Sequence, residues 1–244
     1  TQSASDDTDM GYVLAPVRIR SGNGGKTYAL VANGIDSANG SAVLYAYELD
    51  ANGGIVGGGP HKLVADAGGN GSKNGLMSMG MADLNGDGKV DVVYGGDLKG
   101  NVWRWDFSGA GLPNAPVKLF HAQDGAGNSQ TITGGIAVSR SSSGQIFIGF
   151  GTGGFISQSD IPGNVGYVAQ TQSVYGLIDS GVAIPSRDEL QDRTIVSTGV
   201  DAKGRKTREF ESPSDLPADK QGWYLDLPVP ERVISAPTIL TNGD

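Results

Sequence analysis

Short runs in which apolar residues alternate with polar or small ones recur along the chain, and this period of two predicts β-strands. Three kinds of run return in the same order. An apolar run that follows a small residue or proline comes first, at residues 15–19, 80–82, 135–138 and 236–240. An apolar strand that runs into glycine comes second, at 28–34, 90–96 and 145–151. An aromatic strand that ends at an aspartate comes third, at 44–50, 102–106, 174–179 and 223–226.

The ordered repetition of these runs favours a β-propeller, in which each four-stranded blade takes up one unit of sequence. Successive aromatic strands close at Asp50, Asp106, Asp179 and Asp226, at intervals that bracket or exceed the ~40–50 residues expected of one blade. An antiparallel sandwich has similar turns and aromatic strands and is the alternative. We therefore predict an all-β fold, a modified β-propeller of antiparallel blades, as a single domain over residues 1–244 with a further blade beginning at 236–244.

One stretch departs from the repeated pattern. Ser186 and Glu189 form a capping box, which predicts a short helix continuing through residues 190–191. Two polar strands at 194–198 and 205–210 then predict a hairpin around the turn at 201–204. We interpret residues 181–220 as an insertion that carries this small helix and hairpin, with the basic run at 203–208 as a solvated face.

Composition narrows the range of functions. The chain has 244 residues with 40 glycines, no cysteine and two histidines, which excludes thiolate zinc sites, disulfides and cysteine nucleophiles. Its net charge of −8 disfavours nucleic acid as a partner. No apolar stretch reaches the ~18 residues that indicate a membrane-spanning helix. The polar residues 1–7 lack the features of a signal peptide and read as the boundary of a fragment of a larger protein.

The sharpest chemical signal is a nine-residue loop at 83–91. Side chains that carry oxygen alternate along it, and Gly88 occupies the sixth position, where such a loop turns sharply. Ca²⁺ takes six to eight oxygen ligands, and alternate residues of a curled loop supply them. The predicted ligands are the side chains of Asp83, Asn85, Asp87 and Asp91 and the backbone carbonyl of Lys89.

This loop differs from a helix–loop–helix calcium site. Position 12, where such a site needs an acidic ligand, is Tyr94. Magnesium is a weaker candidate because it requires rigid octahedral geometry, and an aspartate-rich turn bonded only to its own backbone is the alternative without a metal. The sequence leaves open whether a bound ion stabilises the loop permanently or responds to changes in calcium concentration.

Several segments together resemble one family. Residues 81–91, continuing into 94–106, are similar to the calcium-loop blade of PilY/PilC-type type IV pilus proteins. Residues 29–34, 170–176, 222–228 and 231–234 resemble the same family, so that the likeness covers most of the chain. It implies the C-terminal modified β-propeller domain of a large pilus-biogenesis factor and tip adhesin.

The resemblance carries further expectations. It implies a place on the cell surface of a Gram-negative bacterium, at the pilus tip or associated with the outer membrane. It implies type IV pilus components (pilins or minor pilins) as partners, and host or abiotic surfaces as targets of adhesion. Calcium occupancy would regulate pilus extension and retraction, and hence twitching motility. The chain has no Arg-Gly-Asp tripeptide, so integrin recognition is not expected.

Two other classes of protein compete with this one. Calcium-dependent quinoprotein dehydrogenases are also propellers, but their calcium ligands are dispersed along the chain, and no catalytic constellation stands out here; we therefore predict that the chain is not an enzyme. Trp103 and Trp105 are expected to pack in the sheet, with Arg104 on the opposite face. An FG-GAP-like adhesion or glycan-binding propeller, stabilised but not regulated by calcium, is the alternative function, although that family repeats its loop in several blades.

Overall fold

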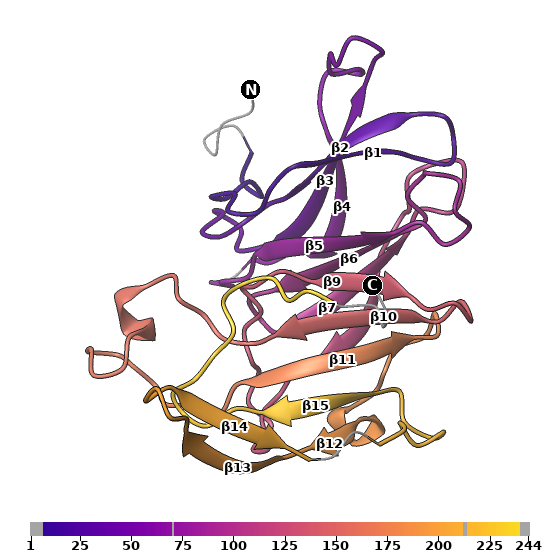
Figure 1. Ribbon diagram of the computed structural model, residues 1–244. Helices are drawn as coiled ribbons and strands as arrows, with labels where there is room; N and C mark the ends of the chain where they lie inside the picture. Colours follow the sequence, from indigo (N-terminus) through magenta and orange to yellow (C-terminus); the bar gives the residue numbers. More distant parts are fainter. Residues whose placement is uncertain (1–6, 70, 212–213, 240–244) are drawn as a thin grey trace.

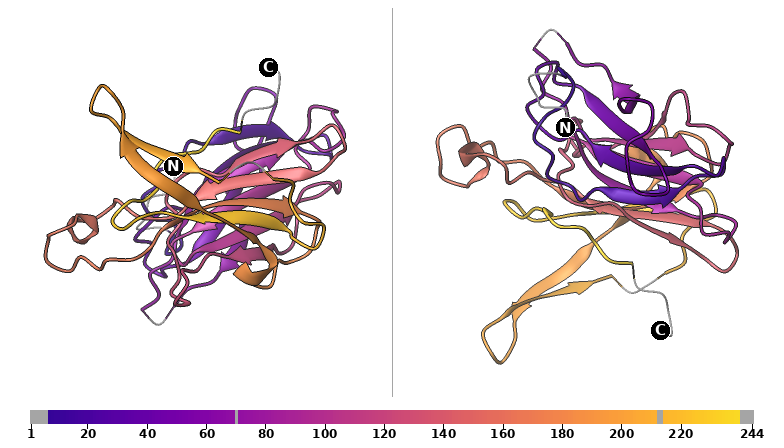
Figure 2. Two further views of the ribbon diagram at one scale, coloured as in Figure 1. Left: turned by 60° about the horizontal axis from the view of Figure 1, so that its bottom comes forward. Right: turned by 90° about the horizontal axis from the view of Figure 1, so that it is seen from above.

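The computed structural model describes residues 7–69, 71–211 and 214–239. Three twisted sheets of four, four and five strands are stacked on one another, and a separate two-stranded hairpin projects from the third sheet (Figures 1 and 2). All neighbouring strands are antiparallel except one parallel pair at the edge of the third sheet. The described residues contain no α-helix and the stack does not close into a barrel. The predicted all-β architecture of antiparallel blades is confirmed.

The first two sheets have the same simple order, in which each strand pairs with its neighbours in sequence. The first sheet consists of β1 (Arg18–Ser21), β2 (Thr27–Ala32), β3 (Ala42–Leu49) and β4 (His61–Asp66). The second consists of β5 (Leu76–Ala82), β6 (Val92–Asp97), β7 (Asn101–Asp106) and β8 (Val117–His121). These are the meanders that alternating strands joined by glycine turns favour.

The third sheet has the order β12-β15-β11-β10-β9. Its strands are β9 (Ala137–Arg140), β10 (Ile146–Gly151), β11 (Ser173–Asp179), β12 (Gln191–Arg193) and β15 (Gly222–Asp226). The projecting hairpin is β13 (Ile195–Val200) and β14 (Lys206–Phe210). Two 3-10 turns, η1 (Gln158–Asp160) and η2 (Arg187–Glu189), complete the described elements.

The core consists of two layers, one between each pair of adjacent sheets. Leu44 and Ala46 of β3 pack with Val93 and Trp105 across the first interface, all fully buried. The second interface is richer in aromatic residues: the Phe150 and Tyr175 rings stack with centroids 5.0 Å apart. Each sheet therefore buries its apolar positions against the next sheet, as stacked blades require.

A polar side chain at the end of the second strand organises each sheet. Asn33, Asp97 and Thr152 occupy this position, and each accepts a hydrogen bond from a backbone N–H at the start of the third strand. The chain between these two strands varies greatly in length. It is only Leu98–Gly100 in the second sheet, whereas in the third sheet it is a long excursion from Thr152 to Gln172 that the sequence did not reveal.

The prediction for one strand is wrong. The run at 223–226 is expected from its pattern to be the aromatic strand of a fourth blade, but β15 lies beside β11 within the third sheet. The Trp223 ring covers Gly176 of β11, where an added Cβ would lie 2.5 Å from the indole. The glycine therefore makes room for the tryptophan of the adjacent strand. Residues 236–239, expected to begin another blade, form no strand, and 240–244 lie outside the described residues.

The segment 181–220 holds the expected turn and hairpin in altered form. The capping serine Ser186 accepts a hydrogen bond from the Asp188 N–H, but the helix is the single 3-10 turn η2. The hairpin β13–β14 forms as predicted. Strand β12, however, joins the third sheet, so not all of this segment stands apart from the blades. The assignment of one domain over 1–244 with an insertion at 181–220 remains a prediction.

Candidate metal site

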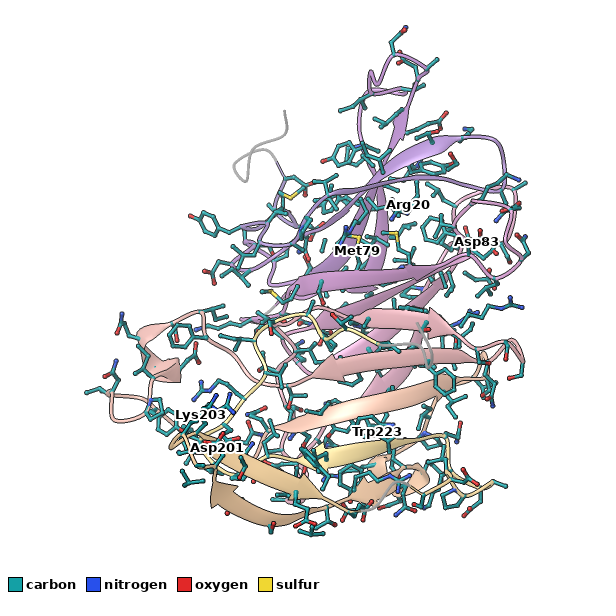
Figure 3. All side chains as sticks on the ribbon, viewed as in Figure 1. Arg20, Met79, Asp83, Asp201, Lys203 and Trp223 are labelled. Atoms are coloured by element: carbon teal, nitrogen blue, oxygen red, sulfur yellow. The ribbon has the colours of Figure 1, made fainter. Side chains whose placement is uncertain are left out.

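The predicted metal-binding loop connects β5 to β6, at one end of the second sheet. Asp83 lies at this end in Figure 3, on the opposite side of the molecule from Asp201 and Lys203 of the hairpin. Asn85 and Asp87 are exposed, whereas Asp91, just before β6, is only 3% exposed. The loop thus places its last acidic side chain inside the protein and the earlier ones at the surface.

Three consecutive turns curl the loop. The Oδ1 atoms of Asp83, Asn85 and Asp87 each accept a hydrogen bond from the backbone N–H two residues later, at 3.2, 2.9 and 3.0 Å. Asp83 also accepts the N–H groups of Gly86 and Gly88, both of which have positive φ. Such turns are the local alternative that Asx side chains offer to regular structure. They bring the three alternating oxygen-bearing residues onto one short coil.

Hydrogen bonds hold the outer acidic groups of the loop in their charged form. The backbone N–H of Gly88 is the main reason why the pKa of Asp83 lies below its ordinary value. The Lys89 amine, 2.8 Å from Asp87 Oδ2, lowers the pKa of Asp87, and Asp87 in turn raises the pKa of Lys89. The loop is therefore anionic at neutral pH, with one of its charges paired to Lys89.

Asp91 is held in a different way. Its Oδ2 accepts the Leu84 N–H at 2.7 Å and its Oδ1 accepts the Asn23 side-chain amide at 2.7 Å. Asn23 Nδ2 also lies 3.1 Å from the carbonyl of Phe107, and the Val90 N–H donates to the carbonyl of Ser21 at 2.9 Å. The turn between β1 and β2 is thereby fastened to the loop of the second sheet.

Sequence reasoning missed Asn23 entirely. It stands in a glycine-rich turn, Ser21-Gly22-Asn23-Gly24, whose composition signals only a chain reversal. Nothing in the local pattern shows that its amide reaches a carboxylate 68 residues later. The contact depends on the stacking of two sheets.

The donor set suits a hard cation, although its carboxylates are not already gathered around one point. In the described part of the chain, no three acidic, imidazole or thiol side chains are close enough to share a metal ion. Yet the loop offers three carboxylates, one amide oxygen and backbone carbonyls, all oxygen donors of the kind that Ca²⁺ takes. Each carboxylate has lone pairs beyond those that accept the hydrogen bonds above. An ion therefore requires the exposed side chains to turn inward.

Other side chains considered from the sequence have structural contacts. Trp105 is fully buried, and Trp103 donates from Nε1 to Asp97 at 2.8 Å. Arg104, on the opposite face of β7, pairs with Asp179 across the second interface at 2.8 Å. His121 Nε2 lies 3.2 Å from the Lys99 carbonyl and 2.9 Å from Ser129 Oγ. These contacts fit the packing roles expected for the two tryptophans.

Comparison with known proteins places this fold in a family. The PilY1 beta-propeller domain matches residues 3–118. A type IV pilus biogenesis factor PilY1 homolog of Xylella fastidiosa is 31% identical over 97% of the chain, and PilY1 of Pseudomonas aeruginosa is 29% identical over 91%. The chain spans only 17% and 22% of the length of these two relatives. Their names describe pilus biogenesis and no enzymatic activity.

A solved structure agrees with the sequence comparisons. The crystal structure of the Pseudomonas aeruginosa PilY1 C-terminal domain superposes with a TM-score of 0.76 at 25% identity, covering 96% of this chain and 56% of that one. No helix among the described residues is long and apolar enough to cross a membrane. The sequence likeness and the shared architecture together show that the chain belongs to the PilY1 family and corresponds to its C-terminal β-propeller domain.

Proposed function

We propose that this chain is the calcium-binding β-propeller domain of a type IV pilus assembly and adhesion factor, and that calcium occupancy of the loop at 83–91 regulates pilus extension and retraction. The printed names of the relatives, type IV pilus biogenesis factors, support the pilus role. We place the parent protein at the cell surface, at the pilus tip or on the outer membrane. Its partners are pilins or minor pilins, and its adhesion targets are host or abiotic surfaces.

The observation that carries the calcium assignment is the environment of Asp91. This carboxylate is buried and its hydrogen-bond donors, Leu84 N–H and the Asn23 amide, are both uncharged. A buried charge without an opposite charge is costly, and a cation in the adjoining loop offsets that cost. Asp83, Asn85 and Asp87 lie on the same short loop and complete an oxygen-rich donor set with the carbonyl of Lys89.

The contacts of the loop suggest how occupancy reaches the rest of the domain. Asn23 ties Asp91 to the turn between β1 and β2, and Val90 forms an isolated bridge with Gly22. A bound Ca²⁺ supplies positive charge that holds the acidic side chains together. The ordered loop then fixes the junction between the first and second sheets, where we place the surface that contacts the pilus machinery.

Calorimetric titration of the chain with Ca²⁺ tests the assignment. Asp87→Ala removes a central ligand and is expected to weaken binding at least about tenfold, or ~1.4 kcal/mol. Asp50→Ala is the matched control, since Asp50 Oδ1 also accepts two backbone N–H groups in an exposed turn that lacks the other acidic donors. Unchanged affinity in Asp87→Ala, or equal losses in both variants, would refute the metal site.

The regulatory role needs a separate measurement on cells. In a strain whose full-length protein carries Asp87→Ala, we expect altered pilus retraction and twitching, with the Asp50→Ala strain unaffected. Loss of calcium binding with normal retraction would leave the ion as a stabiliser of the domain, which is the role expected in an adhesion propeller without regulation.

A further inference from the structure

The long excursion from Thr152 to Gln172 projects from the end of the sheets opposite the candidate metal loop (Figure 1), and residues of this excursion line a cavity. The cavity has a volume of about 400 Å³, within the range of small-molecule sites. Its walls come from the excursion, from Lys73 and Leu98 of the second blade, and from Pro230 and Arg232 after β15. Three separate parts of the chain therefore meet around it.

Arg232 is fixed in place at one side of this cavity. Its Nη1 donates to the Gly154 carbonyl at 2.7 Å, and its guanidinium lies 5.8 Å from the centre of the Tyr167 ring. Its Cβ occupies the space above Gly153, where any side chain would collide at 2.5 Å. These contacts leave the remaining guanidinium N–H groups free to bind a ligand in a preorganised position.

A chain of hydrogen bonds fixes Gln172, another residue of the cavity wall. Gln170 donates from Nε2 to Asp124 at 3.0 Å, so its Oε1 accepts from Gln172 Nε2 at 3.1 Å. The amide of Gln172 is therefore oriented, and its Oε1 atom is buried without a hydrogen-bond partner in the described structure. Such an acceptor is unfavourable unless a donor reaches it. We take a ligand in the adjoining cavity as the source of that donor, which reaches the atom when the side chains that cover it move aside.

The charged side chains around the cavity indicate which other chemical group the ligand carries. Lys73 is exposed and forms no ion pair with a described residue, and Arg232 likewise has none. Asp160 also lines the cavity, and its carboxylate, which accepts the N–H groups of Ile156 and Ser157 and interacts with Arg232, offsets one of the two positive charges. The cavity is thus locally cationic on a chain whose net charge is −8. It favours an anion.

We propose that this cavity binds an acidic sugar, such as a hexuronate unit of a surface glycan. The carboxylate of the sugar pairs with Lys73 and Arg232, and one of its hydroxyl groups donates to Gln172 Oε1. Sulfate and simple carboxylates satisfy the cations, but at neutral pH they carry no O–H group that could donate to the amide oxygen. Neutral sugars can donate a hydrogen bond to the Gln172 amide oxygen, but they leave Lys73 and Arg232 without a counter-charge. An acidic sugar carries both groups, and a disaccharide matches the volume.

Titration of the chain with digalacturonate, followed by NMR, tests this proposal, with digalactose as the neutral control. We expect digalacturonate to bind with a Kd of about 1 mM or tighter and digalactose to bind at least about tenfold more weakly. Lys73→Gln should weaken binding about fivefold and reduce its dependence on salt. Lys203→Gln, which changes an exposed lysine on the hairpin turn that does not line the cavity, should change neither.

Gln172→Leu separates recognition of the hydroxyl group from attraction of charge. We expect it to weaken digalacturonate about fivefold while the salt dependence stays as in the parent chain. The proposal is overturned by absence of binding at about 10 mM sugar, or by equal losses in Lys73→Gln and Lys203→Gln. Sulfate binding as tightly as digalacturonate would also overturn it, because sulfate carries no O–H donor at neutral pH and the site would then respond to charge alone.

Discussion

At the scale of single residues, the contact that joins the second and third sheets is a buried charge pair. Asp179 of β11 has a side chain that is 1% exposed, and its Oδ2 accepts from Arg104 Nε at 2.8 Å. The same oxygen accepts the Tyr94 hydroxyl. Burial raises the pKa of Tyr94 well above its ordinary value, and the Asp179 carboxylate adds to this effect. The phenol therefore stays protonated and remains a hydrogen-bond donor. Tyr94 and Arg104 thus share one acceptor, the Oδ2 atom of Asp179.

Replacing Asp179 should lower the stability of the protein by more than the Asp179–Arg104 pair contributes to it. Asp179→Ala leaves the largely buried Arg104 with only the exposed Asp106 as a described counter-charge, and we expect a loss of about 3–5 kcal/mol in the free energy of unfolding by urea. Tyr94→Phe removes only one hydrogen bond to a charged group and should cost about 1.5–3 kcal/mol. Asp106→Ala is the control, since Asp106 is exposed and lies 3.8 Å from Arg104. Equal losses in the Asp179 and Asp106 variants would contradict this account.

At the scale of elements, the sequence predicted the first three strands of each sheet and missed the fourth strand of the first two sheets. The runs that predicted β2, β3, β6, β7, β10 and β11 each overlap a strand, because these strands lie inside a sheet and bury alternate positions, as in β2, or every position, as in β6. Strands β4 and β8 were not expected. Each begins with two exposed residues and contains a lysine, the composition that protects a sheet edge from further pairing. Half of their surface faces solvent, so their apolar pattern is weak.

The candidate metal loop was recognisable because its signal is entirely local. Oxygen-bearing side chains at alternate positions and two turn glycines occur within nine residues, and the observed Asx turns follow from them. The excursion that forms the cavity had no such signal. Its role depends on Arg232, which contacts Gly154 from 78 residues away. Local chemistry is readable from sequence, whereas sites assembled from several blades are not.

The hairpin β13–β14 should be the least stable described element. It pairs only with itself, and every residue of its two strands is exposed or half-buried, as in an isolated two-stranded ribbon. Its anchors to the body are ion pairs, Arg208 with Glu231 and Arg193 with Glu211 at 3.1 Å. We expect its backbone amides to exchange with deuterium at least about a hundredfold faster than those of β6.

Mass spectrometry of deuterium uptake provides this comparison. Glu231→Gln should accelerate exchange in the hairpin further and leave β6 unchanged, because Glu231 contacts only the hairpin among the described ion pairs. Protection of β13 equal to that of β6 would mean that the hairpin is part of the cooperative core.

At the scale of the whole molecule, the two ends of the stacked sheets carry different candidate sites. The turn between the first and second strands of a sheet lies at one end, and the candidate metal loop is this turn in the second sheet. The turn between the second and third strands lies at the other end, and the excursion with its cationic cavity is this turn in the third sheet. The repeated blade thus supplies a rigid frame, and differences in turn length create separate sites on it.

The distribution of charge also sets how the whole molecule responds to acid. Burial alone would raise the pKa of Asp7 and of Asp9, but the hydrogen bonds and charge of Lys62, together with the other donors to each carboxylate, outweigh it and lower both values. Hydrogen bonds from Lys99 and from the Asn128 backbone likewise lower the pKa of Asp66 and Asp124 against the effect of burial. Because these folded-state values lie below the ordinary 3.8, their stabilisation is complete above about pH 4 and is lost as the pH falls through the lowered values.

We therefore expect the free energy of unfolding in urea to stay nearly constant from about pH 7 to pH 5 and to fall steeply below about pH 4. Lys62→Met removes the charge that lowers the pKa of Asp7 and Asp9. It should cost about 1–2 kcal/mol at pH 7, less than a fully buried pair because Lys62 is 36% exposed. The variant should then lose less stability than the parent between pH 5 and pH 3, since part of the acid-sensitive contribution is already gone. A parallel decline in both proteins would show that the Lys62 contacts do not contribute to acid sensitivity, and would leave the other lowered carboxylates as its source.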